Sequence, residues 1–413
     1  MSGIEPRRLR IALVGTRGVP AAYGGFETAV EEIGQRLVAR GHEVTVYCRR
    51  TNAPRQKRFL GMKLVHLPAV KAKTVETLSH TALSVLHMFF TKRNDVAFVF
   101  NAANSPFVPI VRARGAATAV HVDGLEWKRG KWGKTGRKYY RIAEELAVRQ
   151  ADALISDAAG IADYYSHEFG IPTELLTYGT KVLREPATDR LSELGLEAGR
   201  YHLVVARFEP ENHVDIIVEG YHASDATLPL VVVGSAPYAA AYTERIAQTA
   251  GSDDRIRMLG GVWDQEQLDQ LYANALSYLH GHSVGGTNPS LLRAMGAGTA
   301  VIAYDVVFNR EVLGTDGRFF SDSAEVALEL AAAEALVDET AERGANLRER
   351  AASMYDWDIV TAGYEELAMR LALGHSTRGI SRGVRNAVPW EARSGSDRIV
   401  AADRVEAHIE ETL

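Results

Sequence analysis

Cysteine is almost absent from this chain: Cys48 is the only one in 413 residues. A single thiol excludes an internal disulfide and any zinc site built from cysteines, and it fits a reducing compartment. Long apolar runs are missing too. The longest stretch, around Thr81 to Phe90, contains His87 and is followed by Lys92 and Arg93, so it is too short to span a bilayer. We therefore expect a cytoplasmic protein, or one that is peripheral at the inner face of a membrane.

A strong charge of one sign is also lacking. The formal net charge is −5, which argues against a nucleic-acid partner, so any anionic ligand must meet a local basic patch. At the N-terminus, only the four apolar residues at 11–14 follow the arginines at positions 7, 8 and 10. Four residues are too few for the core of a signal peptide, and they predict a buried strand instead.

What the chain does contain is the composition of a globular protein, with 46% apolar and 24% charged residues. Short apolar runs alternate with amphipathic helical segments, a pattern that indicates βαβ units and parallel sheets. The expected strands form two series, at 10–14, 43–48, 96–100, 117–122 and 153–156, and then at 201–206, 230–234, 256–259, 275–279 and 300–304.

The fold class that we predict is α/β, with two Rossmann-like, doubly wound domains facing each other across a cleft. The N-terminal domain is expected at 1–182 and the C-terminal domain at 183–354. A final helix at 355–373 follows, and a polar stretch at 374–413 is expected to be a flexible tail. Ligands in such folds bind beyond the carboxyl ends of the strands, so the loops there are the candidate site.

The first such loop is rich in glycine. It reads Gly15-Thr-Arg-Gly-Val-Pro-Ala-Ala-Tyr-Gly-Gly-Phe-Glu27 and leads into a helical segment that Gly41 is suited to end. Glycines let backbone approach a ligand, and a helix start presents free amides. The Walker ending and the dinucleotide glycine spacing are both missing. A ligand-binding role and a purely structural one are equally compatible with this loop.

Two further loops follow strands of the second series. Arg207 leaves its strand into the expected crevice, where a guanidinium can clamp a phosphate; a surface salt bridge to Glu209 or Glu211 is the plainer alternative. The segment His280 to Ser290 ends in paired glycines and a helix start at Pro289. Its amides at 286–288 would face an anion, which a plain capped helix does not explain.

A fourth segment, 120–141, interleaves basic and aromatic residues. Trp127, Lys128, Arg129, Lys131 and Trp132 lie at its centre. Indoles and cations together suit an anionic membrane surface, and a polyprenyl diphosphate would satisfy both the charge and the apolar demand. A solvated helix face is the alternative.

In this order, the four segments resemble glycosyltransferase family 4, the retaining enzymes of the GT-B fold, and more narrowly its bacterial rhamnosyltransferase branch. The resemblance covers about residues 8–373. The phrases that carry it are Gly24–Thr28, Asp123–Arg129, Ala206–Asn212, His280–Ser290 and Phe308–Val312.

The resemblance implies a role for each matching position. His121 or Asp123 would lie at the reacting centre, and Arg207 would bind the diphosphate of the donor. The helix at 355–373 would cross back to the N-terminal domain. The other implied donor-binding positions are Gly24, Gly25, Glu27, Asn212, Gly260, Gly261, Val262, Gly286, Thr287, Asn288 and Glu311.

The chain departs from the family at the donor site. A lysine usually stands where this chain has Asn212, and two glutamates stand where it has Gly285 and Arg293. The second glutamate grips the donor ribose in the family. We expect Arg293 to replace part of the missing lysine charge.

The function expected from the sequence is therefore retaining transfer of a sugar from a nucleoside diphosphate donor, with L-rhamnose from dTDP-rhamnose as the best candidate. The acceptor would be a polyprenyl-diphosphate-linked saccharide in cell-surface polysaccharide synthesis. No Asp-x-Asp motif stands where a metal would be useful, so no metal cofactor is expected. A sugar-nucleotide-binding pseudoenzyme, or another GT-B enzyme such as a nucleotide-sugar epimerase, is the alternative.

Overall fold

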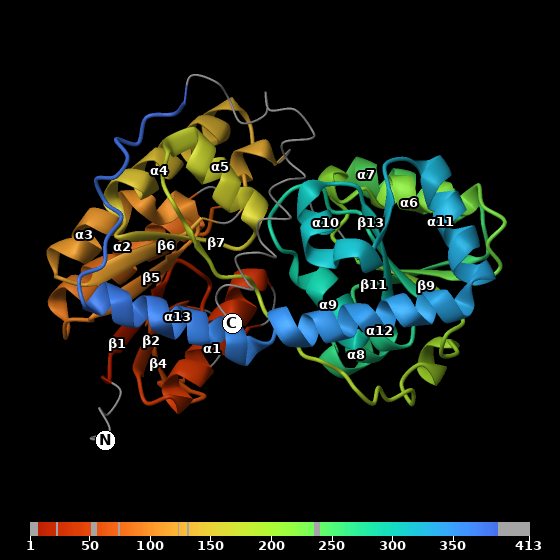
Figure 1. Ribbon diagram of the computed structural model, residues 1–413, viewed down its shortest axis with the longest axis horizontal. Helices are drawn as coiled ribbons and strands as arrows, with labels where there is room; N and C mark the ends of the chain where they lie inside the picture. Colours follow the sequence, from red (N-terminus) through yellow and green to blue (C-terminus); the bar gives the residue numbers. More distant parts are fainter. Residues whose placement is uncertain are drawn as a thin grey trace. The chain divides into compact units, whose positions relative to one another are not determined.

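A computed structural model describes residues 7–21, 24–50, 56–72, 75–122, 124–129, 132–234 and 240–386 (Figure 1). The chain divides into two compact units. Unit 1 combines Met1–Tyr178 with Trp357–Leu413, and unit 2 is Gly179–Asp356. Each unit is built around its own sheet.

Unit 1 contains an eight-stranded sheet in the order β3-β4-β2-β1-β5-β6-β7-β8. Only the β3–β4 pair is antiparallel. The central strands are buried on both faces, as their continuous apolar runs predict. The strands are β1 (Arg10–Val14), β2 (Glu43–Arg49), β3 (Arg58–Phe59), β4 (Met62–Leu67), β5 (Val96–Phe100), β6 (Ala117–His121), β7 (Ala153–Ser156) and β8 (Glu174–Leu175).

Helices from both ends of the chain pack on this sheet. They are α1 (Gly25–Ala39), α2 (Glu76–Phe90), α3 (Val108–Ala113), α4 (Lys134–Gln150), α5 (Ala159–Phe169) and α13 (Trp357–Ala372). The last of these lies alongside α1 (Figure 1). Tyr364 meets Phe98 of β5 edge to face at 5.3 Å, and the Glu365 carboxylate binds both Arg40 and His42 at 2.8 Å. The returning helix therefore belongs to unit 1, through apolar and charged contacts.

Unit 2 contains a six-stranded sheet, parallel throughout, in the order β11-β10-β9-β12-β13-β14. Its strands are β9 (His202–Val205), β10 (Leu230–Val233), β11 (Ile256–Gly260), β12 (Ser277–His280), β13 (Ala300–Tyr304) and β14 (Arg318–Phe320). Its helices are α6 (Val214–His222), α7 (Ala240–Ala250), α8 (Gln265–Ala273), α9 (Pro289–Ala297), α10 (Val307–Leu313), α11 (Ser323–Ala335) and α12 (Val337–Met354). One face of the sheet forms a core in which Val204, Val232 and Leu279 pack against Ile217 and Val326.

The described part of the polar C-terminal stretch, residues 374–386, packs against unit 1. Thr377 donates its backbone N–H to Asp152, and Arg385 inserts between α4 and α5. Its guanidinium lies 2.6 Å from Glu144 and 3.6 Å from Glu168, both buried. A buried ion-pair network thus ties this stretch to unit 1, which its polar composition does not reveal. The rest of the tail, 387–413, lies outside the described residues.

Candidate active site

The glycine-rich loop after β1 is closed by contacts within unit 1. At Gly15 the backbone φ is +102°, and an added Cβ would lie 2.4 Å from the Phe100 carbonyl oxygen, so only glycine fits there. Glu27 accepts a hydrogen bond from the Arg17 backbone N–H at 2.9 Å. Gly24 precedes α1 and has no side chain with which to cap it. Glu27 therefore has a structural role in this loop, and the start of α1 lacks a side-chain cap.

His121 ends β6 and is only 2% exposed. Its ring stacks on Phe100 at 5.7 Å and meets Phe26 edge to face at 5.1 Å. Burial lowers the pKa of His121 to about 3, so the imidazole is neutral. Among the described residues, none hydrogen-bonds its Nδ1. A neutral ring with an unused nitrogen can donate to or accept from a sugar hydroxyl without introducing charge.

The segment after β6 is only partly described, since Asp123 and Lys131 lie outside the described residues. Trp132 is half-buried: its indole N–H donates to Glu126 at 3.2 Å, and its ring packs on Tyr140. Trp127 lies under the Arg141 guanidinium at 4.8 Å, with Lys128 on the same ring at 5.4 Å.

Arg129 forms an ion pair with Glu126. The side chains of Trp127, Arg129 and Trp132 therefore all have partners within the segment 120–141 of unit 1.

Arg207 follows β9 in unit 2. Its side chain is 45% exposed, and its guanidinium pairs with the Glu209 carboxylate at 3.3 Å. The backbone behind it is fixed, because the buried Asn212 amide donates to the Arg207 carbonyl oxygen at 2.8 Å. Asn212 therefore shapes the loop rather than offering its side chain to a ligand. The hydrogen bond from Asn212 thus holds the backbone of this loop, while the Arg207 guanidinium stays accessible to solvent.

This loop is tied to the one that follows β12. Ser283 donates from both its backbone N–H and its hydroxyl to the Glu211 carbonyl oxygen, at 2.9 and 3.1 Å. A Cβ at Gly281 would lie 2.1 Å from the Asn212 carbonyl oxygen, so glycine is required for this close approach. The two loops singled out by the sequence are therefore packed against each other at the carboxyl edge of the sheet.

A hollow of about 190 Å³ lies beside the second loop. The residues that line it are His282, Ser283, Val284, Gly285, Gly286, Asn288, Val306, Phe308 and Asn309. Asn309 supports it by donating to the carbonyl oxygens of His282 and Tyr304, at 3.0 and 2.8 Å. Asn288 caps α9 by accepting the Ser290 N–H at 2.9 Å. Backbone amides at a helix start and a concave surface thus coincide.

A histidine pair stands behind this hollow. His280 is fully buried and stacks on His282 at 4.4 Å. Burial lowers the pKa of His280 to about 3, so it is neutral too. Its Nδ1 lies 3.1 Å from the Tyr278 hydroxyl, which also reaches Ser290. The start of α9 is therefore braced by a neutral polar network that adds no competing charge near an anion site.

Other expected donor-binding positions are more scattered. Gly260 ends β11, and its carbonyl oxygen accepts the Gly234 N–H at 2.8 Å; Gly261 and Val262 follow it. Thr287 is buried. Glu311, on α10, is not among the residues that line the hollow, and its charge helps to raise the pKa of Tyr355.

Arg293 does not fulfil its expected role. Its guanidinium binds the Asp269 carboxylate at 2.6 Å and both the side chain and the backbone of Gln265 at 2.9 Å. These partners lie on α8, so Asp269 neutralises the charge and holds it there. Arg293 therefore joins two helices of unit 2, and its charge is directed at Asp269.

Two kinds of feature are absent from the described part of the chain. No group of histidine, cysteine, aspartate or glutamate side chains there is arranged to hold a metal ion. No helix there combines the length and the apolarity that crossing a membrane requires.

Comparison with known families assigns each half of the chain separately. Residues 192–354 match the family described as Glycosyl transferases group 1. Residues 9–181 match a domain of unknown function (DUF1972). No curated protein matches the chain significantly.

Solved structures give the fold of the whole. Sucrose-phosphate synthase from Thermosynechococcus elongatus superposes with a TM-score of 0.76 at 20% identity, covering 88% of this chain and 99% of that one. HepE from Anabaena, in complex with UDP, has a TM-score of 0.70 at 16% identity, covering 87% and 100%. A glycosyltransferase from Rickettsia africae has a TM-score of 0.68 at 11% identity, covering 90% and 100%. Residues 192–354 form a glycosyltransferase group 1 domain, and the chain as a whole has the GT-B fold. The predicted fold class is thereby confirmed.

Sequence reasoning missed several residues of the candidate site. The bracing role of His280 and the support from Asn309 both need side chains brought together by the sheet. Their signals were present, since both lie in phrases that resemble the family. The ring cluster around His121 had no local signal, because Phe26 and Phe100 come from separate segments.

Proposed function

We propose that this glycosyltransferase binds a nucleoside diphosphate sugar at the carboxyl edge of the unit 2 sheet. The observation that supports the proposal is the pair of loops joined by the hydrogen bonds from Ser283 to Glu211. One loop presents the exposed Arg207 guanidinium, and the other places Gly286 and Asn288 at the hollow beside the start of α9. An exposed ion pair is worth at most about 1 kcal/mol, so Arg207 can leave Glu209 for a diphosphate at little cost. The UDP and UDP-glucose complexes of HepE, which shares the fold, support this class of donor.

The chemistry follows from where charge develops. As the bond from the anomeric carbon to the phosphate oxygen breaks, negative charge grows on the departing diphosphate, and Arg207 and the amides of 286–288 stabilise it. The acceptor oxygen forms the new bond to the anomeric carbon, and its proton passes to a phosphate oxygen of the leaving group. The neutral His121 would orient a donor hydroxyl, with Asp123 beside it in the sequence. Retention of configuration is part of this proposal.

The finer assignments rest on the resemblance to the rhamnosyltransferase branch of family 4. The donor would be dTDP-L-rhamnose, and the acceptor a polyprenyl-diphosphate-linked saccharide at the inner face of the cell membrane. Gly24 and Gly25, at the start of α1, would approach the donor diphosphate, while 260–262 would frame the base. The segment from Trp127 to Trp132 would contact the acceptor.

The test of the activity is a panel of nucleotide sugars offered with lipid extract and scored for release of nucleoside diphosphate. Release that depends on the extract, and is largest with dTDP-rhamnose, is the expected result. Binding of nucleotide sugars with no turnover would identify a pseudoenzyme. Conversion of the donor to an isomer, with no diphosphate released, would identify an epimerase.

Arg207→Ala is the sharpest single variant. Losing one charge-stabilising donor should lower kcat about 10²-fold to 10³-fold, with Arg207→Lys in between because lysine keeps the charge without the fork. Arg245→Ala is the matched control, since Arg245 is also an exposed arginine of unit 2 paired with a carboxylate, Asp215. Equal kcat values for Arg207→Ala and the control would overturn the proposed donor site.

A further inference from the structure

Helix α2 of unit 1 exposes several apolar side chains to the solvent. Its inner side also contains apolar residues that belong to the core, and the buried residues are His80, Thr81, Ser84, Val85 and Met88. The outer residues Leu86 and Phe90 are 52% and 76% exposed. Large apolar side chains that gather on the surface of a helix mark a contact surface.

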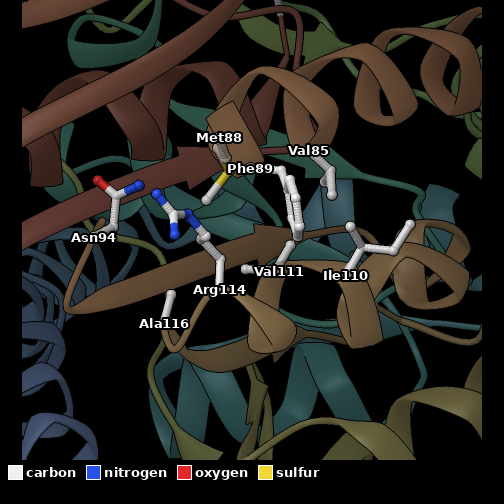
Figure 2. Close-up of a pocket in the computed structure, with 8 residues that line it drawn as sticks. All are labelled: Val85, Met88, Phe89, Asn94, Ile110, Val111, Arg114 and Ala116. Carbon is white, nitrogen blue, oxygen red and sulfur yellow. The ribbon is translucent and has the colours of Figure 1, made fainter. Parts of the chain in front are cut away.

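The exposed apolar surface continues onto α3. Leu83, Leu86 and Phe90 share one side of α2 by their spacing, and Phe89 and Ile110 extend the surface toward the next helix. Leu83, Phe89 and Ile110 are 37%, 41% and 44% exposed. A hollow of about 220 Å³ lies between the helices, with side chains from both around it (Figure 2). We call Leu83, Leu86, Phe89, Phe90 and Ile110 the α2–α3 face.

Charges around the α2–α3 face are of one sign. Residues 77–94 and 96–122 contain no aspartate or glutamate. Lys92, Arg93 and Arg114 are exposed beside the face, and the Arg114 guanidinium lies 5.9 Å from the centre of the Phe89 ring.

The nearest acids along the chain already have cationic partners. Glu76 pairs with Arg49, and Asp95 pairs with Arg10. Asp152, which reaches the same region, pairs with Arg112. The face therefore combines exposed apolar side chains with uncompensated positive charge.

We propose that the α2–α3 face docks on an anionic lipid bilayer. The apolar side chains would enter the headgroup region while Lys92, Arg93 and Arg114 meet lipid phosphates. A second copy of the chain, placed on the same face, would bring these cations together, so charge complementarity favours the lipid. Helix α2, which has 15 residues, would lie parallel to the bilayer surface.

This inference deepens the proposed function by relocating its membrane contact. The segment from Trp127 to Trp132 was the expected membrane anchor, yet Trp132 is bonded to Glu126 and Trp127 lies under Arg141. Their indoles are engaged within unit 1. The α2–α3 face instead offers apolar side chains directly to the solvent, so the acceptor role of the tryptophan segment and membrane docking are separable.

Sedimentation with vesicles tests the docking. Purified full-length protein is mixed with vesicles of phosphatidylcholine alone or of phosphatidylcholine and phosphatidylglycerol in equal parts. The wild type should bind the anionic vesicles and lose binding in high salt. The double variant Leu86→Glu/Phe90→Glu should bind at least about tenfold more weakly. Leu328→Glu is the matched control, since Leu328 of α11 is an apolar side chain that is 69% exposed in unit 2.

Two further measurements make each outcome decisive. Lys92→Glu/Arg93→Glu should also weaken anionic binding about tenfold or more, with a smaller salt dependence. Nucleotide binding by the same preparations, measured without lipid, should be unchanged in all variants, which separates this proposal from the donor site. Wild type that ignores anionic vesicles would overturn the docking proposal. So would sedimentation in solution as a dimer that Leu86→Glu/Phe90→Glu converts to monomer.

Discussion

His121 is a histidine without charge at the proposed reacting centre. Burial alone lowers its pKa to about 3, and no acid contributes to the shift. The ring therefore stays neutral over the whole range in which enzymes of this kind are assayed. A neutral ring can orient a hydroxyl group, but it cannot serve as a titrating acid or base in this pH range.

Replacing His121 by Phe tests that role. Phenylalanine keeps the ring packing against Phe26 and Phe100 and removes both nitrogens. We expect kcat to fall about tenfold or more while the pH profile between 5 and 8 keeps its shape. An inflection near pH 6.5 that disappears in His121→Phe would contradict this expectation.

The same pKa shift makes stability depend on pH. In the unfolded chain His121 becomes protonated below about pH 6.5, whereas in the folded chain it stays neutral down to about pH 3. The contribution of His121 to the stability of the folded state is therefore complete above pH 6.5 and is lost as the pH falls toward 3. Thermal melting from pH 7 to pH 4 should therefore decline less steeply in His121→Phe than in the wild type.

Arg385 is a single residue on which the packing of the C-terminal segment depends. Replacing it by Met leaves Glu144 and Glu168 buried without their cation, which should cost about 3–5 kcal/mol of unfolding free energy at pH 7. Burial raises the pKa of Glu144, so in Arg385→Met this carboxyl should fold protonated. A raised pKa stabilises the folded state at low pH, so the loss should shrink near pH 4 and grow toward pH 7.

Denaturant unfolding of Arg385→Met at the two pH values measures both effects. Arg382→Met is the control, because Arg382 is exposed in the same segment and should change stability by no more than about 0.5 kcal/mol. Equal stability of the two variants at pH 7 would show that the buried ion pairs do not hold this segment.

At the scale of elements, the start of α9 combines a cap and a proposed anion site. Asn288 accepts the Ser290 N–H, which satisfies one of the free donors of the helix. Pro289 contributes no N–H to this helix start, and Gly285 and Gly286 stand in the loop before it. Under the proposed function, Asn288 would influence both helix stability and donor binding.

Two substitutions at Asn288 separate these effects. Asn288→Ala should lower stability by about 1 kcal/mol and weaken nucleotide binding. Asn288→Asp should keep the cap but repel the diphosphate, so melting stays near the wild type while nucleotide affinity falls about tenfold. Asp322→Ala removes the comparable cap of α11 and should lower stability with affinity unchanged. If Asn288→Asp binds nucleotide as tightly as the wild type, the anion site does not lie there.

At the scale of the whole molecule, the chain builds unit 1 from both of its ends. Helix α13 packs on α1, and Tyr364 is fully buried against Phe98 of the sheet. Removing α13 would expose that apolar surface and leave Arg40 and His42 without Glu365. Unit 2, at 179–356, is continuous in the sequence and has its own core.

Fragments test this difference. The fragment 179–356 should express in soluble form and melt cooperatively, whereas 1–178 should aggregate or lack a cooperative transition. Linking 357–386 to 1–178 should restore folding, measured by circular dichroism and thermal melting. A cooperative, soluble 1–178 fragment on its own would show that α13 is not needed for the core of unit 1.

The sequence by itself determined the alternation of strands and helices, and with it the two parallel sheets. Apolar runs bounded by glycine or proline are local signals, and ten of the observed strands fall close to the ranges they predict, whereas β3, β4, β8 and β14 were not predicted. The loops that carry Arg207 and Asn288 could also be found, since each directly follows a strand. The roles of these residues toward a donor remain predictions.

Only the tertiary structure decided which side chains are already committed to other partners. Arg293 meets Asp269 across two helices, Arg385 reaches carboxylates more than two hundred residues away, and Phe90 has no partner in the core. A local pattern records how often a residue type recurs along the chain, but pairing and burial depend on segments that are distant in sequence. For that reason the fold could be read from the residues, while the division between bound and available side chains could not.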